Sequence, residues 1–135
     1  MKLLLDLNVL LDVVQRREPF YTASARVLSR VLDRGATGYL PGHALTTLYY
    51  VVRRAAGKEQ AERVVDLFLA SMEIVPEGKP QFLQARSLPF SDFEDAVVAS
   101  AAQLAGCERI VTRNVADFAG SPVPAVTPEE LLADL

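Results

Sequence analysis

The sequence predicts an α/β domain in which helices cover both faces of a parallel sheet. Two observations predict this fold. Short apolar runs alternate along the chain with longer segments of helical periodicity, and half of the residues are hydrophobic, which is enough to build a core on each side of a sheet. A chain of 135 residues is expected to form one domain, residues 1–135, and no repeat or linker divides it.

Five short apolar runs predict the strands of this sheet. They are residues 2–5, 37–40, 73–75, 110–112 and 125–126. Each run is too brief for a helix, and continuous apolar runs are typical of parallel strands that are buried on both faces. Long connecting segments separate the strands, as parallel pairing requires.

Segments with apolar residues at helical spacing, or with a helix-start signal, predict the helices. They cover residues 7–14, 21–33, 43–56, 58–72, 80–86 and 91–105, and a last helix begins after Thr127. Gly35 is expected to end the second helix as a C′ residue. Ser91, with Glu94 three residues later, predicts a capping box at the sixth helix. Thr127 and Glu130 predict the same motif at the last helix.

Composition limits the classes of partner and compartment. The net charge of −3 provides no global positive field for nucleic acid, so a polyanion would need a local basic patch or metal ions. The pairs Arg16–Arg17 and Arg53–Arg54 are candidate phosphate contacts, although each pair alone is more simply a solvated helix end. A single cysteine, Cys107, excludes an internal disulfide and is expected of a cytoplasmic protein. No run approaches the ~18 apolar residues of a membrane span.

Acidic residues occur at three places close to predicted strand ends or helix starts. Asp6 ends the first strand, Asp92 and Asp95 open the sixth helix, and Asp117 follows the fourth strand. In a parallel sheet the carboxyl ends of the strands line one crevice, where ligands bind. Carboxylate oxygens are the ligands that Mg²⁺ and Mn²⁺ prefer, and such ions commonly serve phosphate chemistry. We therefore expect a divalent-metal site in this crevice.

Helix capping is the competing explanation for each acidic residue. Asp6 could cap the first helix, although an aspartate after an apolar run is costly without a partner. Asp92 in a first helical turn complements the helix dipole. Asp117 could occupy the N3 position of a short helix that has Asn114 as its N-cap. Capping explains Asp95 poorly, because aspartate is a weak helix former beyond the first turn, so Asp95 is the strongest metal candidate.

Several neutral residues are candidates for supporting roles around these carboxylates. Asn114 could bind a metal ion through its amide oxygen, and Thr112, at the strand end, could donate a hydrogen bond to a carboxylate. His43, the only histidine, is expected to start a helix rather than to act as a ligand or base. With one histidine, a Ser-His-Asp triad is not expected, and no P-loop or nucleophile elbow is present.

Three segments, in this order along the chain, resemble the PIN-domain family, the fold of VapC-type toxins of bacterial and archaeal toxin–antitoxin pairs. These segments are residues 5–12, 92–96 and 111–118. The resemblance implies a three-layer α/β/α sandwich with about five short parallel strands. It also implies a Mg²⁺- or Mn²⁺-dependent ribonuclease that acts on RNA, is often a homodimer and is often inhibited by a small antitoxin.

One departure from the family pattern concerns the helix after the second strand, where Thr47 stands at the position of an expected glutamate. Asn114 likewise stands where many members have aspartate, with Asp117 close behind it. In the nuclease interpretation, Asp6, Asp95, Asp92 and Asp117 hold the metal. Asn8, Thr47 and Thr112 position carboxylates or water, and Arg113 contacts the RNA backbone.

Two alternatives remain open at this point. The chain could be a catalytically weakened PIN-like module that acts by binding RNA or protein, which the missing glutamate at Thr47 motivates. It could also be a metal phosphatase of another α/β class. Those enzymes need a second aspartate two residues after the nucleophile, and in this chain that position is Asn8.

Overall fold

The central sheet consists of five parallel strands in the order β3-β2-β1-β4-β5. The computed structural model describes residues 1–135. All five predicted strands are present, as β1 (Lys2–Leu5), β2 (Thr37–Pro41), β3 (Glu73–Val75), β4 (Arg109–Val111) and β5 (Ala125–Val126). The predicted α/β fold with a parallel sheet is therefore confirmed.

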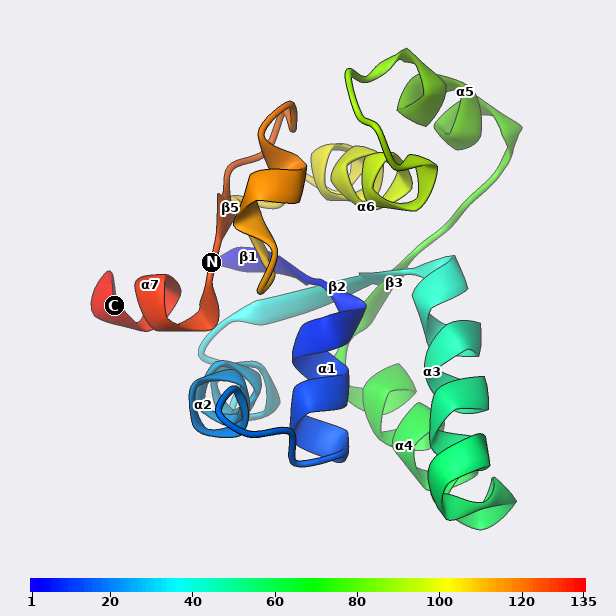
Figure 1. Cartoon of the computed structure of the whole chain (residues 1–135), viewed down its shortest axis with the longest axis vertical. Coiled ribbons are helices and arrows are strands. Elements are labelled where there is room, and N and C mark those ends of the chain that lie inside the picture. The colour runs from blue at the N-terminus through cyan, green and yellow to red at the C-terminus, as the bar shows by residue number, and fades with distance from the viewer.

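Helices cover both faces of this sheet, which gives the predicted three-layer sandwich (Figure 1). The helices are α1 (Leu7–Val14), α2 (Tyr21–Leu32), α3 (Gly42–Ala56), α4 (Lys58–Ser71), α5 (Lys79–Ser87), α6 (Phe93–Leu104) and α7 (Pro128–Ala133). A short 3₁₀ helix, η1, spans Val115–Phe118. No helix is long and apolar enough to cross a membrane.

The two faces of β1 supply the two halves of the core. Leu3 and Leu5 pack with α1, α2, α3, α4 and α7 on one side. Leu4, between them in sequence, packs with α6 and η1 on the other. Successive side chains of a strand point to opposite faces, and a strand at the centre of a sheet is buried on both. The continuous apolar run at the start of the chain is thus explained by its central place.

The strand order also decides which residues meet at the carboxyl edge of the sheet. β1 pairs with β2 on one side and with β4 on the other, with Leu5 opposite Val111. The residues that follow these two partners, Asp6 and Thr112, are therefore neighbours. The chain leaves β1 to build one half of the sheet and later returns to build the other half. Such a switch in strand order opens a crevice where ligands bind in α/β folds.

Two predicted helix boundaries are wrong in an informative way. Arg34, not Gly35, adopts the positive φ (62°) after α2, and the amide of Gly35 bonds to the Arg30 carbonyl in a Schellman arrangement. Asp92, not Ser91, caps α6, so the predicted Ser91–Glu94 capping box does not form. The capping box of Thr127 and Glu130 at α7 is confirmed.

Candidate metal site

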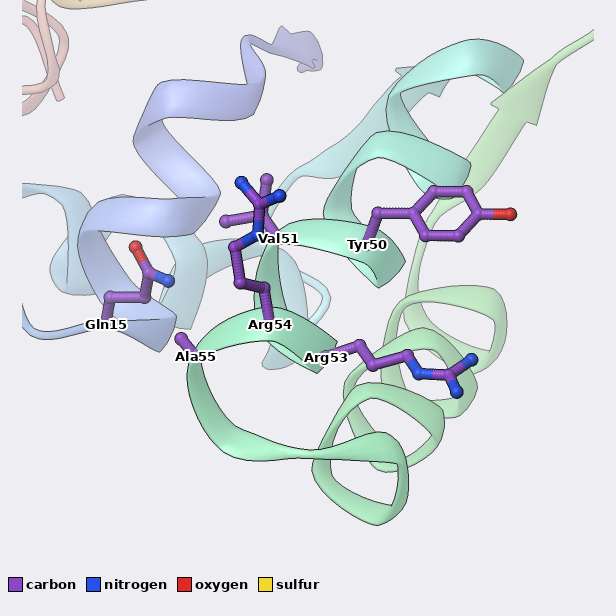
Figure 2. Close-up of a pocket in the computed structure, with 6 residues that line it drawn as sticks. All are labelled: Gln15, Tyr50, Val51, Arg53, Arg54 and Ala55. Carbon is purple, nitrogen blue, oxygen red and sulfur yellow. The ribbon is translucent and has the colours of Figure 1, made fainter.

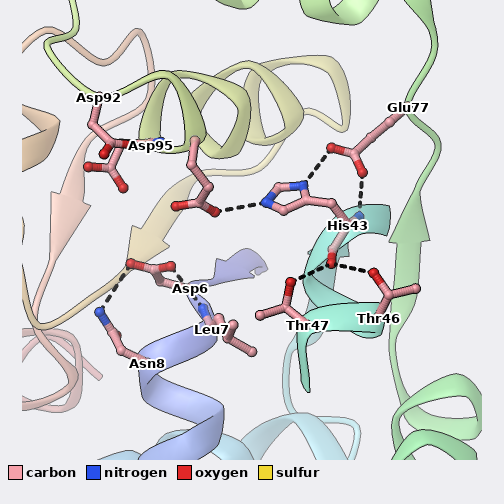
Figure 3. Close-up of polar contacts among 10 residues, drawn as sticks. Asp6, Leu7, Asn8, His43, Thr46, Thr47, Glu77, Asp92 and Asp95 are labelled. Carbon is pink, nitrogen blue, oxygen red and sulfur yellow. Dashed lines mark hydrogen bonds and ion pairs between the residues drawn. The ribbon is translucent and has the colours of Figure 1, made fainter. Parts of the chain in front are cut away.

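Asp6 lies at the carboxyl end of β1 with both carboxylate oxygens held by neighbours. Its side chain is almost fully buried and accepts hydrogen bonds from the Leu7 amide and the Thr112 hydroxyl, each at 2.8 Å, and from the Asn8 side-chain amide at 3.3 Å (Figure 3 shows the first and the last). Burial raises the pKa of Asp6 above its usual value, and the Thr112 hydrogen bond opposes that rise. Asp6 therefore caps α1 and also presents a fixed, buried carboxylate to the crevice.

The first turn of α6 brings three more carboxylates to this crevice. Asp92 caps the helix by accepting the Asp95 amide at 3.0 Å. Oxygens of Asp92, Glu94 and Asp95 all lie within 4.8 Å of one another. Burial first, then repulsion by Asp92, Glu94, Asp6 and Asp117, raises the pKa of Asp95 to about 7. Three of the predicted aspartates, together with Glu94, therefore act on the carboxyl group of the fourth, Asp95.

A histidine bridge that the sequence did not predict borders the cluster (Figure 3). His43 Nδ1 lies 2.7 Å from Glu77 Oε2, and His43 Nε2 lies 2.8 Å from Glu94 Oε2. The hydrogen bond to Glu94, followed by that to Glu77, raises the pKa of His43 to about 9. His43 does begin α3, as predicted, but as an imidazolium between two carboxylates it also contributes the one cation that contacts the acidic cluster directly.

Glu77 reaches this bridge from the loop after β3. Its side chain is only 11% exposed, and it also accepts the backbone amide of His43. Gly42 makes room for it, because a Cβ at that position would lie 3.1 Å from Glu77 Oε1. The partners of His43 lie 34 and 51 residues away in the sequence, so no local motif could have indicated the bridge.

The neutral candidates have distinct places. Thr112 and Asn8 contact Asp6, as predicted for supporting residues. Thr47 borders the crevice, but its hydroxyl donates to the His43 carbonyl at 3.1 Å rather than to a carboxylate. Asn114 also borders the crevice, where its backbone amide donates to the Thr112 hydroxyl and its side chain forms no helix cap.

Arg113, a predicted RNA contact, is bound to the protein itself. Its Nε lies 2.8 Å from Oδ2 of the fully buried Asp12, and its guanidinium stacks 4.2 Å from the centre of the Phe20 ring. A quarter of the side chain is exposed. Because breaking a buried ion pair strands a charge, Arg113 fastens the loop after β4 to α1, and its contact with RNA stays a prediction.

Together these residues enclose a cavity of about 340 Å³ at the carboxyl edge of the sheet. The polar groups around it are Asp6, Asn8, His43, Thr47, Glu94, Asp95 and Asn114. Clustered carboxylates with a raised pKa repel one another until a proton or a cation joins them. The acidic residues offer only oxygen atoms as metal ligands, which fits a hard divalent ion such as Mg²⁺ or Mn²⁺.

Comparison with known proteins identifies the same fold. The sequence profile of the PIN domain matches residues 2–116. No significantly similar sequence is found among curated proteins.

Solved structures with this fold include toxin–antitoxin proteins. VapBC2 from Rickettsia felis, bound to a promoter DNA fragment, has a TM-score of 0.70 at 20% identity, over 94% of this chain and 98% of that chain. VapBC-1 from nontypeable Haemophilus influenzae has a TM-score of 0.69 at 16% identity, over 96% and 99%. VapC20 from Mycobacterium tuberculosis, a sarcin-ricin loop cleaving toxin, has a TM-score of 0.64 at 12% identity, over 80% and 86%. At such low identities the likeness shows the shared fold.

Proposed function

Because the chain belongs to the PIN-domain family, we propose that it is a divalent-metal-dependent endoribonuclease. The single observation that carries the proposal is Asp95, whose pKa is raised to about 7 by burial and by the carboxylates of Asp92, Glu94, Asp6 and Asp117. A group perturbed in this way within a crevice is a functional-site candidate, because selection for folding alone would not gather like charges.

Asp6, Asp95, Asp92 and Asp117 would hold one or more Mg²⁺ or Mn²⁺ ions. Such ions, when bound, lower the pKa of water and neutralise charge on a phosphate. The protein's own contribution is positional. Thr112 and Asn8 both donate to Oδ2 of Asp6, and the Leu7 amide donates to Oδ1. The α6 backbone fixes Asp92 through the Asp95 amide. His43 and Glu77 restrain Glu94 at the edge of the cluster.

We further propose that this nuclease is a toxin with a small antitoxin partner, that it forms a homodimer and that it acts in the cytoplasm. The support is the fold shared over nearly the whole chain with the VapBC proteins named above. Co-expression with a candidate antitoxin followed by size-exclusion chromatography with light scattering tests the partner and the oligomeric state together.

The direct test of the nuclease is cleavage of a mixed-sequence single-stranded RNA by the purified protein in Mn²⁺, Mg²⁺ or chelator. The natural protein should cut only with metal, and Asp6→Asn and Asp95→Asn should each abolish cutting. Asp66→Asn, an equal change on the exposed face of α4, is the matched control and should cut normally. Full activity of Asp95→Asn, or cutting in chelator, would refute the proposal.

A second candidate function rests on Thr47. Because threonine stands at the position of the expected glutamate, α3 supplies no carboxylate to the cluster, and the Thr47 hydroxyl instead bonds to the His43 carbonyl. A module with weakened catalysis that acts by binding RNA or protein would fit this arrangement. A folded, partner-free protein that binds RNA but cuts none, even in excess Mn²⁺, would favour this candidate over the nuclease.

A further inference from the structure

Helices α1 and α3 leave the acidic cavity side by side and line two cavities in succession. Along α1, Leu7 and Leu11 line the acidic cavity and Gln15, one turn later, lines the second. Along α3, His43 and Thr47 line the first, and Tyr50 and its followers line the second. Residues four apart share a helix face, so the two cavities follow one another along the same side of each helix. We call the surface that runs over α3 from the first cavity to the second the groove.

The far end of this groove is basic. The second cavity, of about 830 Å³, is lined by Gln15, Tyr50, Val51, Arg53, Arg54 and Ala55, without an acidic residue (Figure 2). Both arginines are exposed and neither forms an ion pair; Arg53 only donates to the Tyr49 hydroxyl at 3.4 Å. In a protein of net charge −3, two arginines that line one cavity without carboxylate partners form a local site for an anion.

Tyr50 adds an aromatic surface at the basic end of the groove, where it lines the second cavity. Its side chain is 67% exposed and, like that of Arg53, projects from α3 on the side away from α1 (Figure 2). The edge of the neighbouring Tyr49 ring, with a centroid distance of 5.5 Å, supports one side of it. An exposed aromatic ring beside free arginines is the combination with which proteins stack bases and bind phosphates of single-stranded nucleic acid.

We propose that a single-stranded segment of RNA, adjacent to the phosphate being cleaved, lies along the groove over α3. Arg53 and Arg54 bind its phosphates, and one of its bases stacks on Tyr50. The step from Thr47 to Arg54 is seven residues, about 10 Å of helix, so the basic end lies close enough for one short segment to reach both. The proposal rests on the proposed function, because the acidic cavity fixes where the cleaved phosphate lies.

The charges favour RNA over a protein segment as the occupant. A peptide that filled both cavities would need a cationic end at the acidic cluster and an anionic end at the arginines. RNA needs only its own phosphates, which the arginines bind directly and which bound metal ions attract at the other end.

The test measures binding of a fluorescently labelled, mixed-sequence RNA of about twelve nucleotides by anisotropy, in chelator, over a series of salt concentrations. Arg53→Gln with Arg54→Gln should weaken binding at least tenfold and reduce the salt slope by about 1.4, because each lost phosphate contact on a single strand removes about 0.7. Tyr50→Ala should weaken binding about tenfold with an unchanged slope. Arg26→Gln with Arg30→Gln, an equal charge change on the exposed side of α2, should leave both quantities unchanged.

The possible outcomes test the RNA-binding groove and the proposed nuclease independently. An unchanged affinity and slope in the Arg53/Arg54 variant overturns the groove, even if the natural protein cleaves RNA in Mn²⁺. An equal loss in the Arg26/Arg30 variant also overturns it, because net charge rather than the groove would then explain binding. A selective loss in a protein that never cleaves RNA supports the groove and refutes the nuclease. Loss of antitoxin binding without loss of RNA binding would assign the groove to a protein instead.

Discussion

Replacing Asp95 by asparagine should stabilise the metal-free protein. The carboxyl group of Asp95 is partly buried beside four other carboxylates. Burial first, and then repulsion by these carboxylates, raises its pKa from 3.8 to about 7. Its side chain makes no hydrogen bond that asparagine would lose; only its backbone amide bonds to Asp92. The substitution therefore removes a repelled charge and keeps the shape of the residue.

The size of the effect follows from the pKa. One pKa unit corresponds to about 1.4 kcal/mol, so the upper limit for Asp95 is about 4 kcal/mol. The side chain is only partly buried, and solvent screening reduces the expected gain in unfolding free energy to about 1–2 kcal/mol. For a domain of this size, that gain raises the melting temperature by about 4–8 °C.

The gain must depend on pH in a defined direction. Because the pKa of Asp95 is raised in the folded state, the natural protein loses stability as the pH rises from about 4 to about 7. Thermal unfolding followed by circular dichroism in chelator should show the full gain of Asp95→Asn at pH 8 and less than half of it at pH 5. Asp66→Asn should show none. No gain at pH 8, or an equal gain at pH 5, would refute the repulsive cluster.

Three further predictions test other parts of the site and core. Glu94→Gln should lower the pKa of His43 from about 9 toward 6.5, and by more than Glu77→Gln does, because the Glu94 hydrogen bond is the larger cause of the raised pKa. Proton NMR can follow this titration because the chain has a single histidine. A larger effect of Glu77→Gln would contradict the bridge. Thr47→Glu should strengthen Mn²⁺ binding in calorimetry, whereas Thr46→Glu, outside the cavity, should not; equal effects would mean that Thr47 does not face the metal. Gly38→Ala should destabilise the fold by about 1–3 kcal/mol in urea, because its Cβ would lie 2.8 Å from Val31 Cγ1; a neutral result would show that the core relaxes there.

The sequence predicted the part of the site that depends on strand ends. Asp6 and Thr112 could be paired in advance, because an apolar run followed by a polar residue marks a strand end, and parallel strands end at one edge. Asp92 and Asp95 were identifiable from their i, i+3 spacing on one helix face.

Residues with two plausible partners could not be assigned from the sequence. Glu94 fits a capping box with Ser91, but the tertiary contact with His43 takes it instead, and Asp92 becomes the cap. Arg113 was expected to contact RNA, which stays a prediction, and its ion pair with the buried Asp12 was not foreseen. In each case the side-chain partner lies far away in the sequence, and distance in three dimensions is not visible in a single sequence.

The place of β1 at the centre of the sheet has a consequence for synthesis on the ribosome. Asp6 emerges among the first residues, but the Thr112 hydroxyl that holds it follows 106 residues later. Until β4 pairs with β1, one edge of the first strand and the aspartate at its end have no partner. A nascent chain that lacks β4 therefore contains Asp6 but cannot yet form the crevice. For the nuclease proposed above, this order of assembly would leave the ribosome-bound intermediate without a completed site for cutting RNA.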